Sequence, residues 1–215
     1  MMEQGPQSKP QSQLQPYEPY QASGERADFT EHTITSERLL TGKLIKVQSD
    51  QVRLPDGTES YREYVLHPGA VIIAAFIDAD TLIFEHQYRH PPRRHFIELP
   101  AGKIDEGEPH FATARRELLE ETGYRAADWA RAGLMHNAIA YSTERIEVWF
   151  ARGLVQGTRQ LDHGEFLDVL EAEAAVLDEW ARRGEITDAK TLVGLLWLQN
   201  WRAGRWPLEW QCAPA

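Results

Sequence analysis

The stretch from Gly102 to Tyr124 constrains the fold more than any other part of the 215-residue chain, because it predicts one well-bounded helix. Proline suits the first turn of a helix, where its missing N–H needs no partner, and Pro109 fits that place. Glycine readily adopts the left-handed conformation that ends a helix, and Gly123 fits the stop. We therefore expect residues 109–122 to form one helix.

This predicted helix gathers three carboxylates. Glu117 and Glu121 are four residues apart and Glu120 is three from Glu117, so all three lie on one face. Like charges placed in this way repel and weaken an isolated helix. A hard divalent cation such as Mg²⁺, which prefers oxygen ligands, would reverse that penalty. The alternative is a solvated acidic face, the commoner origin of a charge run of this kind.

The residues around the glutamates favour the metal site. Gly102 is followed after five residues by Glu108 and after seven more by Arg116. The remaining fixed positions are Glu117, Leu118, Glu120, Glu121, Gly123 and Tyr124. This pattern resembles the signature of the Nudix hydrolases, which cleave nucleoside diphosphates linked to another group. The resemblance implies a cation, Mg²⁺ or alternatively Mn²⁺, held by the helix glutamates and the backbone carbonyl of Ala101, with Glu117, Glu120 and Glu121 catalytic.

Composition narrows the class of partner and the compartment. A formal net charge of −10 argues against a nucleic-acid binder, which needs clustered Lys and Arg. Cys212 is the only cysteine, so neither a disulfide framework nor a thiolate zinc site is expected. The sequence has no apolar run of the roughly 18 residues that a membrane span needs, and its N-terminus is polar. We expect no membrane association and a cytoplasmic location.

Changes in composition and in hydrophobic pattern divide the chain into four expected segments. Residues 1–28 are rich in Gln, Pro and Ser and predict a disordered tail. Residues 29–67 carry alternating apolar residues and turn chemistry, which predict a small antiparallel β-subdomain. Residues 68–206 are expected to form the hydrolase domain and residues 207–215 a C-terminal tail.

Strands and helices interleave in the hydrolase domain. The expected strands are 71–77, 81–87, 96–99, 145–152 and 165–170. The expected further helices are 172–183 and one that begins after a cap at Thr187 or Asp188 and runs to about Ala203. Strands enclosed by helices predict an α/β fold with a mixed β-sheet between helices. This is the Nudix-type α/β/α sandwich that the resemblance implies, with the N-terminal β-subdomain attached.

Short matches outside the helix resemble the ADP-ribose pyrophosphatase branch of the family. They are Arg62-Glu63, Gln87-Tyr88-Arg89, Glu98-Leu99-Pro100-Ala101-Gly102 and Gly184-Glu185-Ile186-Thr187-Asp188-Ala189-Lys190. The resemblance implies hydrolysis of ADP-ribose or a related ADP-sugar to AMP and a sugar phosphate. The alternatives are another nucleoside diphosphate sugar such as GDP-mannose, a dinucleotide, or a non-catalytic module that senses ADP-ribose.

The resemblance also assigns substrate contacts. Arg89 would bind the diphosphate, because a guanidinium can fork two phosphate oxygens; the alternative is a surface ion pair. Arg62 and Glu63 match positions that hold the adenosine, often across a homodimer that exchanges N-terminal strands, so a homodimer is expected. Glu98 would orient a ligand or water near the same turn.

Two features of the expected site stay open in the sequence. Glu165 is the candidate for positioning or deprotonating the attacking water, with Glu144 as the competitor, although a metal-activated water may need no dedicated base. The branch usually carries Ser-Pro-Gly before the strand that follows the signature, whereas this chain has Ala138, Ile139 and Ala140. Because the proline marks a preference for ADP-ribose, Ile139 leaves the exact substrate open.

Overall fold

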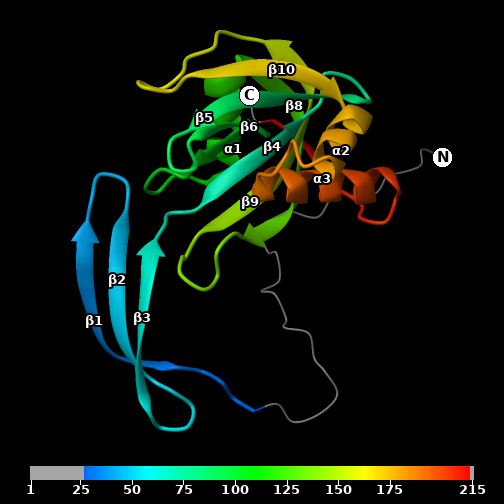
Figure 1. Ribbon diagram of the computed structural model, residues 1–215. Coiled ribbons are helices and arrows are strands. Elements are labelled where there is room, and N and C mark those ends of the chain that lie inside the picture. Colours follow the sequence, from blue (N-terminus) through cyan, green and yellow to red (C-terminus); the bar gives the residue numbers. More distant parts are fainter. Residues whose placement is uncertain (1–26, 214–215) are drawn as a thin grey trace, which may run out of the picture.

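A computed structural model describes residues 27–213, which form an N-terminal sheet standing apart from a larger α/β body (Figure 1). Residues 1–26 of the expected N-terminal tail lie outside the described residues. In the described part of the chain, no helix is long and apolar enough to cross a membrane. The expected fold class is confirmed, both for the α/β body with its mixed sheet and for the small N-terminal antiparallel sheet.

The N-terminal sheet consists of β1 (His32–Thr41), β2 (Lys46–Arg53) and β3 (Glu59–Leu66), paired antiparallel in that order. Between β2 and β3 the side chain of Asp56 accepts the Thr58 N–H at 2.9 Å, and Gly57 has a φ of 85°, so this turn suits aspartate and glycine. Every residue of β1 is exposed. β1 therefore leaves one sheet edge and much apolar surface uncovered.

The body contains two sheets. One has the strand order β11-β8-β9-β4-β7 and the other β10-β5-β6. The first sheet is mixed, because β4 runs parallel to β9 whereas the other pairs are antiparallel. Its strands are β4 (Ala70–Ala75), β7 (Ala101–Lys103), β8 (Tyr124–His136), β9 (Arg145–Gln156) and β11 (Trp210–Cys212). The strands of the second sheet are β5 (Thr81–Arg89), β6 (Arg94–Glu98) and β10 (Leu167–Glu173).

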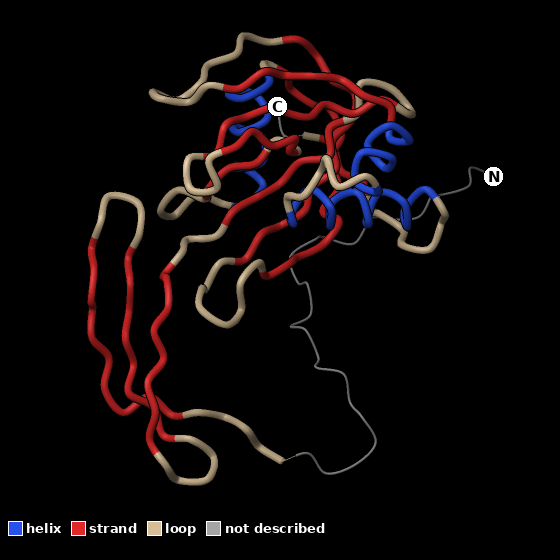
Figure 2. Tube along the Cα trace, in the orientation of Figure 1, coloured by secondary structure: helices blue, strands red, loops and turns tan. Residues whose placement is uncertain are grey.

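Helices cover both sides of these strands (Figure 2). α1 (His110–Thr122) packs Ala114 and Leu118 against Val71 and Ile73 of β4. On the opposite side, α2 (Ala174–Arg182) and α3 (Ala189–Arg202) pack against the alternate residues of β4, among them Ile72 and Ala74. All six residues of β4 are buried, as the continuous apolar run predicts for a strand covered on both faces.

The structure corrects the sequence prediction along the second half of the body. Residues 124–136 form the long strand β8, which the sequence did not indicate, because its alanines, arginines and glycine give little β-propensity. The adjoining strand β9 continues to Gln156, beyond the expected end at 152, and β10 begins at Leu167. These strands are stabilised by pairing with each other and with β5 rather than by local pattern.

Part of the expected C-terminal tail is also ordered. Within residues 207–215, β11 pairs antiparallel with β8, and Trp210 lies opposite Ala130. The Trp210 ring packs 5.8 Å from the ring of Trp201, centroid to centroid, and lies 4.0 Å below the guanidinium carbon of Arg152. These aromatic contacts and ladder bonds anchor Trp210–Cys212 to the body.

A buried ion cluster fastens the start of α1 to the large sheet. The Oε1 atom of Glu147 lies 2.9 Å from Nδ1 of His110 and 2.9 Å from Nη2 of Arg131, and its Oε2 accepts the indole N–H of Trp149 at 3.2 Å. Burial alone would raise the pKa of Glu147, but the hydrogen bonds from Arg131 and His110 outweigh it and lower that pKa. The glutamate is therefore more acidic in the folded protein than in the unfolded chain.

Because the pKa of Glu147 is lowered by folding, its contribution to stability is complete above the unfolded value of about 4.3 and is lost as the pH falls below it. We expect Glu147→Gln to lower the free energy of unfolding at pH 7 by about 3 kcal/mol, because Arg131 would be left without its partner. Urea denaturation of both proteins at pH 7 and at pH 3.5 measures this difference, which should shrink at the lower pH. A difference independent of pH would contradict the assignment.

Candidate active site

The helix carboxylates are held against the turn that precedes the helix. Glu121 is only 4% exposed, and its Oε2 accepts the backbone N–H of Ala101 at 2.9 Å. The helix ends as predicted at Gly123, whose φ of 78° is left-handed and whose N–H donates to the Leu119 carbonyl at 2.9 Å. The end of α1 and the start of β7 are thereby joined through Glu121.

Gly102 lets a second glutamate approach the same turn. A side-chain carbon at position 102 would overlap the carboxyl group of Glu117. Glycine is therefore required there because the backbone and the carboxylate come so close. Together, Ala101 and Gly102 bring the carboxyl groups of Glu117 and Glu121 to one end of β7.

Arg116 links the helix to the loop before it. Its Nε and Nη2 donate to the two oxygens of Glu108 at 3.0 and 2.9 Å, while Nη1 donates to both Glu117 and Glu120 at 2.9 Å. Nη2 also donates to the carbonyl of Lys103 at 3.2 Å. The hydrogen bonds from Arg116 hold the pKa of Glu108 at about 2, and those same bonds raise the pKa of Arg116. Arg116 thus fixes the rotamers of three glutamates.

Negative charge at this site exceeds the positive charge that balances it. Burial raises the pKa of Glu117 to about 7, although Arg116 acts in the opposite direction. Burial also raises the pKa of Glu121 well above its usual value, and the charges of Glu85 and Glu117 add to this effect. A bound cation would relieve both effects. The carboxylate donors therefore fit a hard divalent cation in chemical type and in charge.

The side chains are nevertheless not arranged as a finished coordination shell. Across residues 27–213, no group of three or more His, Cys, Asp or Glu side chains is gathered closely enough to hold a metal ion. The ion pairs of Arg116 account for part of this arrangement, because Glu117 and Glu120 turn one oxygen each to its guanidinium. Donor chemistry and uncompensated charge, rather than a preformed shell, identify the site.

Glu98 lies at the centre of a second charged cluster. Arg89 donates to its two oxygens at 2.7 and 2.9 Å, and Lys190 donates to the same carboxylate. Lys190 also lies 2.9 Å from Asp188, which caps α3 by accepting the Thr191 N–H at 2.9 Å. Burial would raise the pKa of Glu98, but Arg89 and Lys190 together lower it. Arg89 therefore pairs with a buried carboxylate, while 42% of its own side chain stays exposed.

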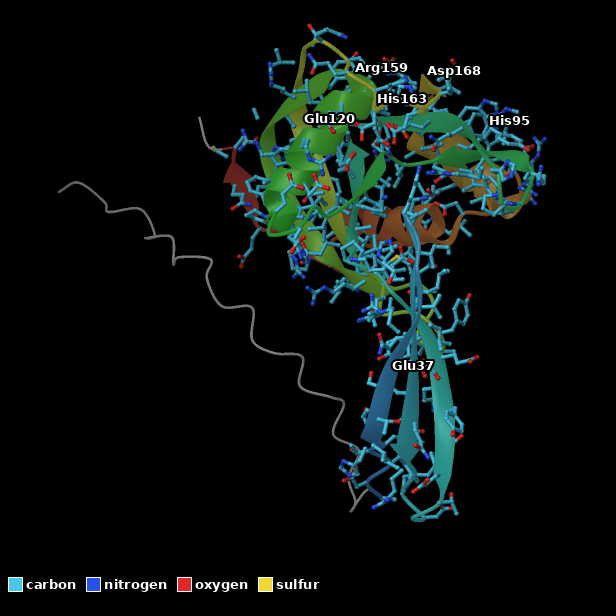
Figure 3. All side chains as sticks on the ribbon, turned by 90° about the vertical axis from the view of Figure 1, so that its left-hand side faces the viewer. Glu37, His95, Glu120, Arg159, His163 and Asp168 are labelled. Atoms are coloured by element: carbon cyan, nitrogen blue, oxygen red, sulfur yellow. The ribbon has the colours of Figure 1, made fainter. Side chains whose placement is uncertain are left out.

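The loop between β9 and β10 brings Glu165 toward α1. The Gln160 N–H donates to the Glu120 carbonyl at 3.1 Å, and Figure 3 shows Arg159 of this loop beside Glu120. The charge of Glu165 raises the pKa values of Glu117 and Glu121, so it acts on the helix carboxylates. By contrast, Glu144 accepts a hydrogen bond from Asn137 at 3.2 Å and lies 3.6 Å from His67, away from α1.

Arg62 and Glu63 lie in a different place from the helix glutamates. They line a cavity of about 230 Å³ between β3 and the loop that carries Ile139. Arg62 is held there by Glu31, whose Oε2 accepts its Nε at 2.8 Å. The structure thus brings Arg62, Glu63 and Ile139 together, whereas none of the α1 glutamates lines this cavity.

A larger cavity, of about 410 Å³, opens on the β10-β5-β6 sheet, on the face turned away from α1. Side chains alternate along β5, so Glu85 and Arg89 share the face of Ile83, which packs toward α1. His86 and Tyr88 lie on the opposite face and line the cavity. Its size does not make it the candidate active site, because the helix glutamates are absent from its lining.

Two residues of the site are missing from the sequence prediction. Lys190, on α3, pairs with Glu98, and the match before the last helix includes it without a role. Glu85, on β5, is 1% exposed, and its charge raises the pKa of Glu121. Its signal in the sequence is a charged residue that directly follows the apolar run Leu82-Ile83-Phe84.

Comparisons with known proteins show the family of the chain. A model of the NUDIX domain matches residues 66–191. The chain is 37% identical over 171 residues to an ADP-ribose pyrophosphatase of Bacillus subtilis, covering 79% of this chain and 92% of that protein. It is 35% identical over 173 residues to a methanol dehydrogenase activator of Bacillus methanolicus, covering 80% and 94%.

The fold also matches a solved structure. The crystal structure of an ADP compounds hydrolase has a TM-score of 0.75 to this chain at 22% identity, covering 85% of this chain and 98% of the other. Structural likeness at that identity supports the architecture alone. From the domain match and the relatives, together with the carboxylate helix docked on Ala101 and Gly102, the chain belongs to the Nudix hydrolase family.

Proposed function

We propose that this Nudix pyrophosphohydrolase uses Mg²⁺, or alternatively Mn²⁺, to split the diphosphate of ADP-ribose or a related ADP-sugar into AMP and a sugar phosphate. The observation that carries the proposal is the cluster of helix carboxylates around the Ala101-Gly102 turn, where buried negative charge lacks compensation. The B. subtilis relative named an ADP-ribose pyrophosphatase supports the choice of substrate.

Glu117, Glu120, Glu121 and the carbonyl of Ala101 would hold the cation. A divalent cation bound there would neutralise the charge of the diphosphate and favour ionisation of the attacking water. Arg116 holds the rotamers of Glu117 and Glu120 through its Nη1 atom. The protein thereby orients its carboxylates before the substrate arrives, which limits the reorganisation needed during the reaction.

Hydrolysis forms a bond between a water oxygen and one phosphorus and breaks the bond from that phosphorus to the bridging oxygen. Glu165 is proposed to take the proton of the attacking water, because its charge acts on Glu117 and Glu121. Glu144, which contacts Asn137 and His67 instead, is the weaker candidate. The two electrons of the broken bond stay with the leaving phosphate.

The other substrate contacts follow from the two clusters away from α1. Arg89 and Glu98 are proposed to contact the substrate together, since Glu98 fixes the guanidinium while much of the Arg89 side chain stays exposed. Arg62 and Glu63 are proposed to bind the adenosine in the cavity beside Ile139.

A homodimer through the N-terminal sheet is the proposed assembly. Edge strands with exposed apolar residues invite pairing with another chain, and β1 exposes 40% of Ile34, 49% of Leu39 and 52% of Leu40.

We propose the cytoplasm as the compartment, because the sole cysteine, Cys212, is free and the described chain needs no oxidising environment.

Replacing Glu121 with glutamine tests the cation site. We expect Glu121→Gln to lower kcat by orders of magnitude, because a neutral amide is a weaker cation ligand. Its melting temperature without metal should change little, since the amide oxygen can still accept the Ala101 N–H. Steady-state kinetics with Mg²⁺ and a thermal melt measure both. Glu171→Gln, on the exposed part of β10, is the control, and wild-type turnover in Glu121→Gln would refute the site.

A substrate panel with product identification tests the specificity. We expect ADP-ribose to give AMP and ribose 5-phosphate with a higher kcat/KM than GDP-mannose or diadenosine diphosphate. Preference for either of the latter would establish the alternative substrate, and tight ADP-ribose binding without Mg²⁺-dependent hydrolysis would identify a sensing module.

Arg62→Ala should raise KM about tenfold, the worth of one charge-assisted hydrogen bond. Arg53→Ala, in the ion pair with Glu59 on the same sheet, should not.

Sedimentation analysis of the full chain tests the dimer. We expect the wild type to be a dimer at micromolar concentration and Leu40→Asp to shift it toward monomer, because a charge would then face the buried partner surface. Val155→Asp, at a residue 65% exposed on the body, provides the matched control and should leave the dimer intact. A monomeric wild type would rule out this assembly.

A further inference from the structure

Glu85 occupies an unusual position for a carboxylate. It lies in the middle of β5, between β6 and β10, where its register partners are Glu98 and Val169. The residue is 1% exposed, and its Oε1 atom has no hydrogen-bond partner. Buried polar atoms are normally satisfied, so an orphaned carboxylate oxygen at a buried position of a strand needs an explanation.

The carboxyl group of Glu85 is directed toward α1. Its charge raises the pKa of Glu121, the residue that joins α1 to the N–H of Ala101. It also lies on the same face of β5 as Ile83, which packs with Leu118 of α1. Glu85 therefore adds a carboxyl group to the proposed cation site from a strand of the other sheet.

Three of the cations nearby are paired with other carboxylates. Arg89 and Lys190 pair with Glu98, and Arg116 pairs with Glu117 among others. None of these three cations forms an ion pair with Glu85 or Glu121, and Arg159, whose charge also acts on Glu85, donates to the Leu167 carbonyl at 2.6 Å. Buried acidic groups usually pair with cations or coordinate metals. Glu85 and Glu121 do not pair with these cations, so coordination of a metal is the arrangement to consider.

A purely structural role explains less of what is observed. Ile83 fills the preceding position on the same face of β5, and Val169 lies opposite Glu85 on β10, so an apolar side chain suits the surroundings. Such a side chain would leave no unpartnered oxygen and no second acid beside Glu121. The glutamate thus weakens the packing of the strand without gaining a full set of hydrogen bonds.

We infer that Glu85 is a further oxygen donor of the divalent-cation site, acting beside Glu121. The inference rests on the proposed function, since it concerns the same site. It assigns to β5 a role that the helix signature does not contain. The site then draws its oxygen donors from α1, from the turn at Ala101 and from a strand of the second sheet.

Calorimetric titration of the full-length protein with Mn²⁺, in the absence of substrate, tests the inference. We expect Glu85→Val to weaken Mn²⁺ binding roughly tenfold or more, the loss typical when a supporting group of a metal site is removed. Glu85→Gln, which keeps a neutral oxygen, should bind with intermediate affinity. The metal-free melting temperature of Glu85→Val should equal or exceed that of the wild type, because a buried acid has been replaced by an apolar group.

Glu147→Gln is the matched control, because Glu147 is also a buried strand glutamate but pairs with Arg131 and His110. It should lower the melting temperature and leave Mn²⁺ affinity unchanged. Unchanged affinity in both Glu85 variants would overturn the role of Glu85 while leaving the proposed function intact. If Glu85→Val fails to fold, the Mn²⁺ affinity of Glu85→Gln alone decides whether Glu85 belongs to the cation site. A wild type that binds no Mn²⁺ would overturn the cation site itself, and the inference with it.

Discussion

The site depends on the docking of α1 against the turn at Ala101 and Gly102. One hydrogen bond, from the Ala101 N–H to Glu121, joins the end of the helix to the strand, and the missing side chain of Gly102 makes room for Glu117. The rest of the fold supports this contact: β4 anchors β7 on one side, and Leu118 is buried in the core below. A shift of the helix by one turn would remove both contacts.

This docking concentrates more acid than the protein neutralises. Glu108 and Glu98 are satisfied by Arg116, Arg89 and Lys190, so these carboxylates behave as ordinary ion-paired groups. The carboxyl groups of Glu117 and Glu121 instead have raised pKa values, because burial is only partly offset, by Arg116 for Glu117 and by the Ala101 N–H for Glu121. Strain of this kind typically accumulates where a ligand completes the structure, and it lowers the stability of the protein alone.

The sequence predicted what local chemistry determines. Gly123 ends α1, Asp188 caps α3, and the apolar run of β4 is buried on both faces, because each depends on a few neighbouring residues. The strand β8 and the ordering of Trp210 depend on pairing partners far along the chain, so no local pattern indicates them. The sequence did not predict a role for Lys190 or Glu85 for the same reason, because the groups they act on lie on elements that only folding brings together.

The attachment of the N-terminal sheet to the body is narrow. Val65 donates its N–H to the Tyr141 carbonyl at 2.9 Å and accepts the Thr143 N–H at 3.0 Å, and these bonds join β3 to the loop that carries Ile139. The same loop lines the cavity with Arg62 and Glu63. One short stretch therefore joins the sheet to the body and also lines the cavity, so a change in its length would move the sheet and reshape the cavity together.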